Sequence, residues 1–160
     1  MAEIVKRCKK LAFYGVPGGD GTVTYKRMKG FDEITTSKNP MEYSRQYVDE
    51  EFEQTEVVGY ATSIAFAFDL FTDDAVHADI ASIFDDEKTG EDAVRSIIMV
   101  DISKEGGLAV KREFSVIAES EGDGKEAYKY KGSFRAKGEK VIGTASSADG
   151  WQTVTFEEAN

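Results

Sequence analysis

Apolar and polar residues alternate with a period of two along most of this chain, and this pattern strongly limits its possible folds. Between residues 60 and 71, Ile64, Phe66 and Phe68 share one side, while the residues between them fall on the other. Successive side chains of a β-strand point to opposite faces of a sheet, so the pattern predicts strands. Strands are also expected at residues 22–28, 30–36, 95–102, 108–116, 128–135, 140–145 and 151–156.

Clusters of glycine and aspartate separate these segments. They lie at residues 18–21, 106–107, 121–124 and 149–150. Glycine supplies the positive φ angles that tight hairpins require. Strands at this spacing predict an antiparallel sandwich or barrel. Residues 95–102 are partly apolar on both faces, which predicts a strand covered on both sides.

One segment, about residues 73–85, has helical spacing instead. Its apolar residues are Val76, Ile80, Ile83 and Phe84, and two aspartates precede them, where carboxylates suit the helix dipole. The predicted fold class is therefore mainly β (α+β): an antiparallel β-sandwich with one flanking α-helix. A length of 160 residues fits a single domain spanning 1–160.

The segment 38–58 follows neither period, and it contains tyrosines, an arginine and a phenylalanine. Long irregular loops in compact domains usually serve a function, and interfaces are enriched in aromatic residues and arginine. We expect an arm that leaves the sandwich and docks on a neighbour. The alternative is an ordinary meander folded back onto its own core.

The composition excludes some classes of protein. The net charge is −10, from 30 acids and 20 bases, which argues against a protein that grips nucleic acid but suits a conduit that repels phosphate. In residues 128–135 aromatic and basic side chains alternate, so they cannot hold a nucleotide jointly. Cys8 is the only cysteine, and no apolar run suits a secretory signal or a membrane span. We expect synthesis in the cytoplasm and no membrane insertion.

No candidate for chemistry is convincing. His77 is alone, and we interpret it as a partly exposed helix-surface residue without a nucleophile beside it. The acids at 73–74 and 85–87 lack the spacing of a calcium loop, and residues 18–21 lead into a strand, unlike a phosphate-binding loop. Cys8 lies among basic residues but has no histidine partner motif. The prediction is a protein that is not an enzyme, with no catalytic residue, cofactor or metal.

Several stretches together resemble the major tail proteins, or tail tube proteins, of long-tailed phages of Gram-positive bacteria. The similarity runs from about residue 11 to residue 156. It is carried by Phe13-Tyr14-Gly15-Val16-Pro17, Arg27-Met28-Lys29-Gly30-Phe31, Thr36-Ser37-Lys38-Asn39-Pro40, Glu42-Tyr43-Ser44-Arg45-Gln46-Tyr47-Val48-Asp49-Glu50, Asp92-Ala93-Val94-Arg95, Gly138-Glu139-Lys140-Val141-Ile142-Gly143 and Trp151-Gln152.

The resemblance implies a structural subunit of the virion tail that forms stacked hexameric rings around an acidic, DNA-conducting lumen. It also implies tape-measure, tail terminator and distal tail proteins as partners. The long loop would reach the neighbouring subunit through Tyr43, Arg45, Tyr47, Asp49, Glu50 and Phe52. As lumen acids we take Glu33, Asp101 and Glu113, at exposed-face positions of expected strands.

Two alternatives stay open, and a third fails. The first is the tube of a phage-tail-like bacteriocin or contractile injection system. The second is a monomeric β-barrel carrier of a small ligand, which would pack residues 38–58 on its own chain. The third, an enzyme, lacks a converging nucleophile, base and oxyanion donor.

Overall fold

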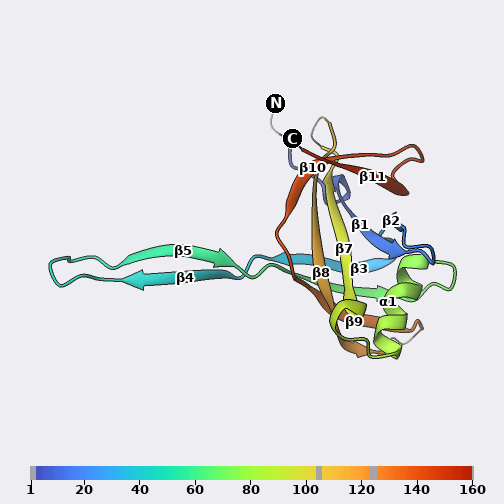
Figure 1. The fold of residues 1–160 in the computed structure, drawn as a ribbon, viewed down its shortest axis with the longest axis horizontal. Helices are drawn as coiled ribbons and strands as arrows, with labels where there is room; N and C mark the ends of the chain where they lie inside the picture. The colour runs from blue at the N-terminus through green and yellow to red at the C-terminus, as the bar shows by residue number, and fades with distance from the viewer. Residues whose placement is uncertain (1–2, 104–105, 123–125, 160) are drawn as a thin grey trace.

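The computed structural model describes residues 3–103, 106–122 and 126–159. They form a body, in which one α-helix packs on an antiparallel β-sheet, and a two-stranded hairpin that projects from it (Figure 1). The predicted mainly-β sandwich with a single flanking helix is confirmed. We call the hairpin, residues 40–60, the arm.

The element bounds are as follows. The strands are β1 (Lys10–Pro17), β2 (Val23–Arg27), β3 (Phe31–Ser37), β4 (Pro40–Arg45), β5 (Gln54–Tyr60), β6 (Ser63–Asp69), β7 (Val94–Asp101), β8 (Leu108–Glu121), β9 (Lys129–Ala136), β10 (Val141–Ser146) and β11 (Thr153–Glu158). The helices are α1 (Ala75–Asp85) and two 3-10 turns, η1 (Arg7–Lys9) and η2 (Gly90–Ala93).

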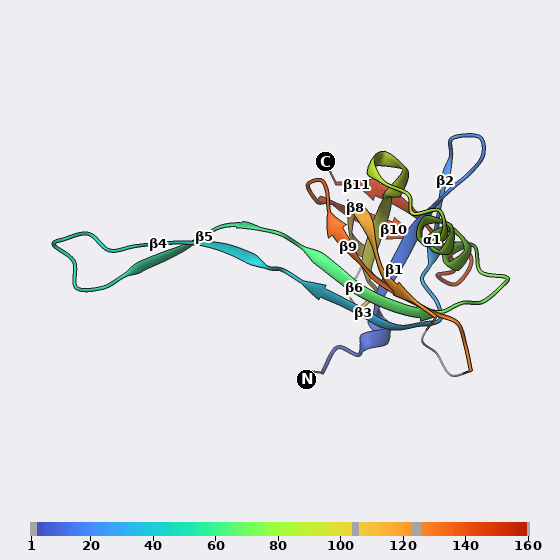
Figure 2. The ribbon, with the colours of Figure 1, turned by 90° about the horizontal axis from the view of Figure 1, so that it is seen from below.

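The long strand β8 organises the sheet. The order is β10-β11-β2-β1-β7-β8-β9-β6-β3, and β10 pairs with β8 as well. On one side of β8, β9 pairs with residues 114–121 and β10 with residues 108–111. Residues 137–140 connect β9 to β10. Strand β9 pairs on its other side with β6, whereas β10 pairs on its other side with β11. The sheet therefore folds over itself into two layers (Figure 2).

The two faces of β1 and β7 pack into two different hydrophobic clusters. Tyr14 and Ile97 belong to the cluster beneath α1, whereas Phe13 and Ile98 belong to the cluster between the sheet layers. All four side chains are fully buried or nearly so. The prediction that residues 95–102 are covered on both sides is therefore confirmed.

Helix α1 begins at Ala75, two residues later than predicted, because Asp74 caps it. Asp74 Oδ1 accepts hydrogen bonds from the amides of Val76 at 2.9 Å and His77 at 3.2 Å. The helix ends at Asp85, and Glu87 takes a positive φ of 49° just beyond it. The helix contributes Val76, Ile80, Ile83 and Phe84 to the core, as their spacing predicts.

The interpretation of His77 as partly exposed is wrong. Its side chain is completely buried, and its ring stacks 4.5 Å from the ring of Phe68. Nδ1 accepts from the Phe71 amide at 3.2 Å, so Nε2 is the nitrogen that donates, to the Lys29 carbonyl at 2.6 Å. His77 therefore joins α1 to two loops as a satisfied core residue.

Two other expectations need correction. Residues 38–58 form most of a two-stranded hairpin, β4 and β5, where an irregular loop was expected, and β1 was not predicted as a strand. The glycine-rich turns take positive φ at Gly21, Gly106, Gly107, Gly122 and Gly150, as expected. Residues 123–124 of the third cluster lie outside the described residues.

A partly buried polar cluster joins α1 to β1 and β7. The Tyr14 hydroxyl donates to Asp79, and Arg95 Nε donates to the same carboxylate at 2.8 Å. Burial, and then the charge of Asp79, raises the pKa of Tyr14 well above its ordinary value. The hydroxyl thus stays protonated as a donor.

We predict that Asp79→Ala lowers the free energy of unfolding by about 3–5 kcal/mol, because Arg95 loses its partner in a largely buried site. Urea denaturation measures this loss. Asp73→Ala, at an exposed position next to the helix, is the matched control and should change stability by less than about 0.5 kcal/mol. Equal effects of the two substitutions would contradict the assignment.

Candidate assembly interface

The arm stands clear of the body. Within the described residues, β4 and β5 pair only with each other, from Pro40 opposite Tyr60 to Arg45 opposite Gln54, with a shift of register between Met41 and Glu42. At about 3.3 Å per residue, the six paired residues of β4 extend roughly 20 Å, and the turn at residues 46–53 lies beyond them. Both views show the arm leaving the body, which excludes the meander folded back on its own core (Figures 1 and 2).

Asn39 sets the junction between the arm and the body. It takes φ of 46°, a left-handed conformation that asparagine tolerates better than most residues. Its Nδ2 donates to the Ala61 carbonyl at 2.9 Å and to Ser63 Oγ at 3.1 Å, and its carbonyl accepts from the Ala61 amide. The ladder of β3 and β6 therefore continues into that of β4 and β5 through a bend.

One face of the arm carries an ordered aromatic and basic cluster. The Arg45 guanidinium lies 5.7 Å from the Tyr43 ring centroid and 5.9 Å from that of Tyr47. Arg45 Nη2 donates to Glu56 at 2.8 Å, and this bond raises the pKa of Arg45. Arg45 Nε is buried without a hydrogen-bond partner among the described residues.

Of the predicted loop residues, the structure brings Tyr43, Arg45 and Tyr47 together. Residues 46–53 form the far end of the arm, which we call the tip; Tyr47 belongs to it and contacts Arg45 from there, whereas Asp49, Glu50 and Phe52 lie further along it. Sequence reasoning missed Glu56, because its approach to Arg45 depends on the register of the hairpin. The β-branched, alternating residues 54–58 are the signal that could have revealed the second strand.

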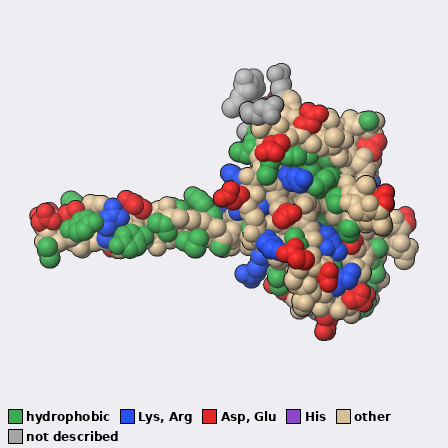
Figure 3. Space-filling model, in the orientation of Figure 1, with side chains coloured by type: hydrophobic (Ala, Val, Ile, Leu, Met, Phe, Trp, Pro, Cys, Tyr) green, Lys and Arg blue, Asp and Glu red, His purple; other side chains and the backbone are tan. Residues whose placement is uncertain are grey.

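Apolar side chains are exposed along the arm to an unusual degree. Of the sixteen large apolar side chains exposed in the described part of the chain, eight lie between residues 41 and 60. They are Met41, Tyr43, Tyr47, Val48, Phe52, Val57, Val58 and Tyr60. Concentrated exposed apolar surface marks an interaction site, and a lone two-stranded hairpin is marginally stable in water (Figure 3). The arm therefore has the properties of a segment that is completed by a partner.

The sheet also has an open edge. Strand β3 ends the strand order, and its outer edge has no partner strand among the described residues. An open edge presents unpaired backbone groups to any strand that fits. Strand β3 leads directly into β4, so the outer edges of these two strands form one continuous edge without a partner strand among the described residues.

The three acids taken as lumen residues lie in different environments. Glu113 is exposed on β8, and Glu33 is half-buried on β3 beside a bulge. Asp101 is not at an exposed-face position, since it is only 7% exposed. Lys10 Nζ lies 2.7 Å from Asp101 Oδ2, and the Ser103 amide donates to Oδ1 at 3.0 Å, so its charge is compensated within the chain.

The residues considered as candidates for chemistry have the following environments. The described part of the chain includes no group of three or more His, Cys, Asp or Glu side chains that could hold a metal ion. Both ring nitrogens of His77 are engaged, and Cys8 is exposed in η1. Among the described helices, none is long and apolar enough to cross a membrane.

Comparison with solved structures identifies proteins with the same fold. A chain of the tail of an empty GTA particle, refined with helical C6 symmetry, has a TM-score of 0.60 and 14% identity, covering 88% of this chain and 98% of its own. A chain of the 6-fold symmetrised baseplate of the anti-feeding prophage has a TM-score of 0.52 and 6% identity, covering 90% and 98% respectively. No protein-family model and no curated protein sequence matches the chain. At such low identities the likeness establishes the fold alone.

We predict that Asn39→Ala loosens the junction, because it removes two side-chain hydrogen bonds and strains a left-handed residue. A local loss of about 1.4 kcal/mol corresponds to roughly tenfold faster hydrogen exchange at the Ala61 amide. Asn39→Gly loses the same hydrogen bonds without the backbone strain, so its exchange rate at the Ala61 amide should fall between those of the wild type and Asn39→Ala. Unchanged exchange in Asn39→Ala would refute the role of Asn39.

We predict a pH-dependent contribution from Asp101. Hydrogen bonds from Lys10 and then Ser103 lower the pKa of Asp101 to about 2 in the folded chain, below the roughly 3.9 of an unfolded aspartate. The contribution of Asp101 to the free energy of unfolding is thus complete above about pH 4 and disappears as the pH falls through about 2. Urea denaturation across this range should show a shallower loss of stability in Asp101→Asn and in Lys10→Met than in the wild type. Parallel pH profiles would contradict the assignment.

Proposed function

We propose that this chain is a structural, non-enzymatic subunit of a phage-type tail tube, assembling into stacked hexameric rings around a lumen. The observation that carries the proposal is the arm, a projecting hairpin with exposed apolar residues on a body of the fold described above. The two proteins of similar fold come from particles with six-fold symmetry, which supports this ring size.

The mode of contact follows from the asymmetry of the molecule. The arm leaves the body beside the open edge of β3, and the two surfaces are continuous. A partner that covers the arm of one copy presents its own arm to the next copy. Such head-to-tail contacts close into rings or propagate as stacks. Each pairing removes an open edge and buries apolar residues of the arm.

In the tube, the lumen would contain a tape-measure protein and later DNA, with terminator and distal tail proteins at the ends. The net charge of −10 supports passage of DNA without adhesion, because acidic walls repel phosphate. Of the acids considered, we propose Glu33 and Glu113 for the lumen wall. The compensated charge of Asp101 suits this role less.

A second candidate is the tube of a phage-tail-like bacteriocin or contractile injection system. The similarity to a chain of the anti-feeding prophage baseplate favours keeping it. The small-ligand carrier fits less well, because it requires residues 38–58 on their own chain. The space between the sheet layers is also occupied, by residues that include Phe13, Val100 and Val154.

We predict that the purified chain forms rings or tubes visible by negative-stain electron microscopy as its concentration rises. Replacing residues 41–59 by Asn-Gly should abolish them. The body should still fold, because the arm pairs with no strand of the body within the described residues. Thermal unfolding followed by circular dichroism is the control.

Two outcomes would contradict the proposal in different ways. A wild-type chain that stays monomeric at every concentration would refute the proposed tube. Tubes that persist after the replacement, with an unchanged melting transition, would remove the arm from the assembly.

A further inference from the structure

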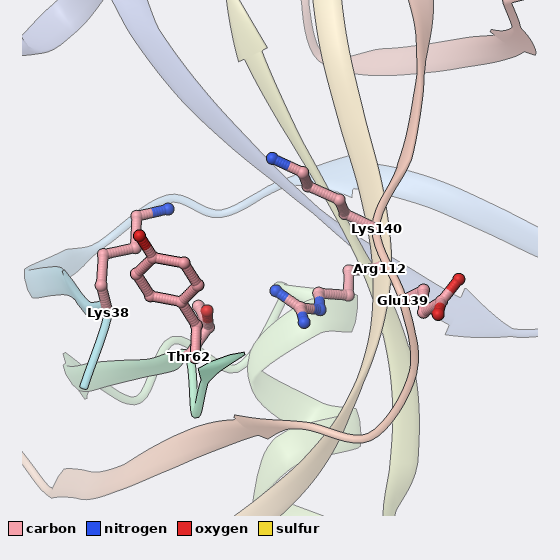
Figure 4. A pocket seen from close by; sticks show the side chains of 6 residues that line it. Lys38, Thr62, Arg112, Glu139 and Lys140 are labelled. Carbon is pink, nitrogen blue, oxygen red and sulfur yellow. The ribbon is translucent and has the colours of Figure 1, made fainter. Parts of the chain in front are cut away.

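A basic pocket of about 560 Å³ lies where the arm joins the body. Its lining residues are Lys38, Tyr60, Thr62, Arg112, Glu139 and Lys140. They come from the two sides of the arm junction, from β8 and from the connection between β9 and β10. Lys38, Arg112 and Lys140 surround the space, whereas the Glu139 carboxylate points away from them (Figure 4). We call it the root pocket.

The positive charge of the root pocket is not neutralised within the described part of the chain. None of Lys38, Arg112 and Lys140 takes part in an ion pair there. Arg112 Nε donates to the Gly138 carbonyl at 2.7 Å, which fixes the side chain without compensating its charge. The pocket thus presents three bases and one averted acid on a chain that is acidic overall.

The tip of the arm has the complementary composition. Residues 46–53 contain four acids, Asp49, Glu50, Glu51 and Glu53, and no base. Val48 and Phe52 are the two most exposed large apolar side chains of the arm. Gln46 Nε2 donates to the Glu50 carbonyl at 3.0 Å and Gln54 Nε2 to the Glu50 carboxylate at 2.9 Å, so the tip is an ordered turn. It offers a compact acidic and apolar surface.

We infer that the root pocket of one copy of this chain binds the acidic tip of the arm of another copy. The inference rests on the proposed assembly and specifies its contact. The tip cannot reach the pocket of its own chain, because the paired strands β4 and β5 hold it roughly 20 Å from the junction. The contact is therefore intermolecular, and each copy both donates a tip and receives one.

The pocket also suits this ligand in form. Tyr60 is 57% exposed at the rim and offers an aromatic surface to Val48 or Phe52 of the incoming tip. Amines and a guanidinium then face carboxylates, an arrangement that gives charge-assisted hydrogen bonds. Contacts of this kind weaken as salt screens them, so assembly should weaken from low to high ionic strength.

A charge-exchange experiment tests the inference. The tip variant Asp49→Lys/Glu51→Lys/Glu53→Lys carries more bases than acids, and the pocket variant Lys38→Glu/Lys140→Glu carries more acids than bases. All five positions are exposed. Each variant alone should need at least a tenfold higher concentration than the wild type to form rings or tubes. The chain that combines all five substitutions should assemble again.

A matched control separates a specific contact from a change in net charge. Glu3→Lys/Glu157→Lys/Glu158→Lys makes the same charge change as the tip variant at exposed positions outside the arm. It should assemble like the wild type. Circular dichroism melting confirms that every variant is folded.

The outcomes distinguish this inference from the proposed function. Suppose that the wild type assembles. If the tip variant and the pocket variant then assemble equally well, or if the chain that combines them does not recover assembly, the tip–pocket contact is refuted and the proposed tube stands. A control that fails like the tip variant would attribute the loss to net charge and also refute the contact. A wild type that never assembles would refute the tube itself.

Discussion

The pairing of both β9 and β10 along one side of β8 is the constraint on which the rest of the molecule depends. It forces a break between the two strands at residues 137–140. Strand β9, before the break, belongs to one sheet layer, and β10, after it, belongs to the other. Through β9 it positions β6, and β6 with β3 forms the base from which the arm extends. The same break places Lys140 near Arg112 of β8, so it also creates the root pocket.

The arm follows different energetics from the body. The body buries Tyr14, Phe66 and Phe134 completely, whereas the arm has neither a core nor a third strand. Hydrogen bonds between two exposed strands contribute little net free energy in water. The stacked Tyr43–Arg45–Tyr47 cluster orders one face of the arm before any partner arrives. Such ordering reduces the entropy that association must overcome.

The sequence predicts elements well where one face is buried and poorly where burial is uniform. Ile64, Phe66 and Phe68 mark β6 by alternation, but residues 11–15 of β1 are all buried and show no period. The strands of the arm escape prediction for the opposite reason, since nearly all their side chains are exposed. His77 was misjudged because its partners, Lys29 and Phe71, are brought to it by loops. The root pocket combines residues from 38 to 140, a juxtaposition that only the fold creates.

The distribution of charge reconciles self-assembly with a strongly acidic chain. A net charge of −10 makes copies repel one another at long range, so assembly requires local opposite charge at the points of contact. The root pocket concentrates three bases beside the arm, and the tip concentrates four acids at its far end. At physiological salt, screening limits interactions between exposed charges to about 8 Å, so contacting surfaces attract each other while more distant acids repel weakly. A chain arranged in this way can be cohesive at its ends and still present a repellent surface to phosphate elsewhere.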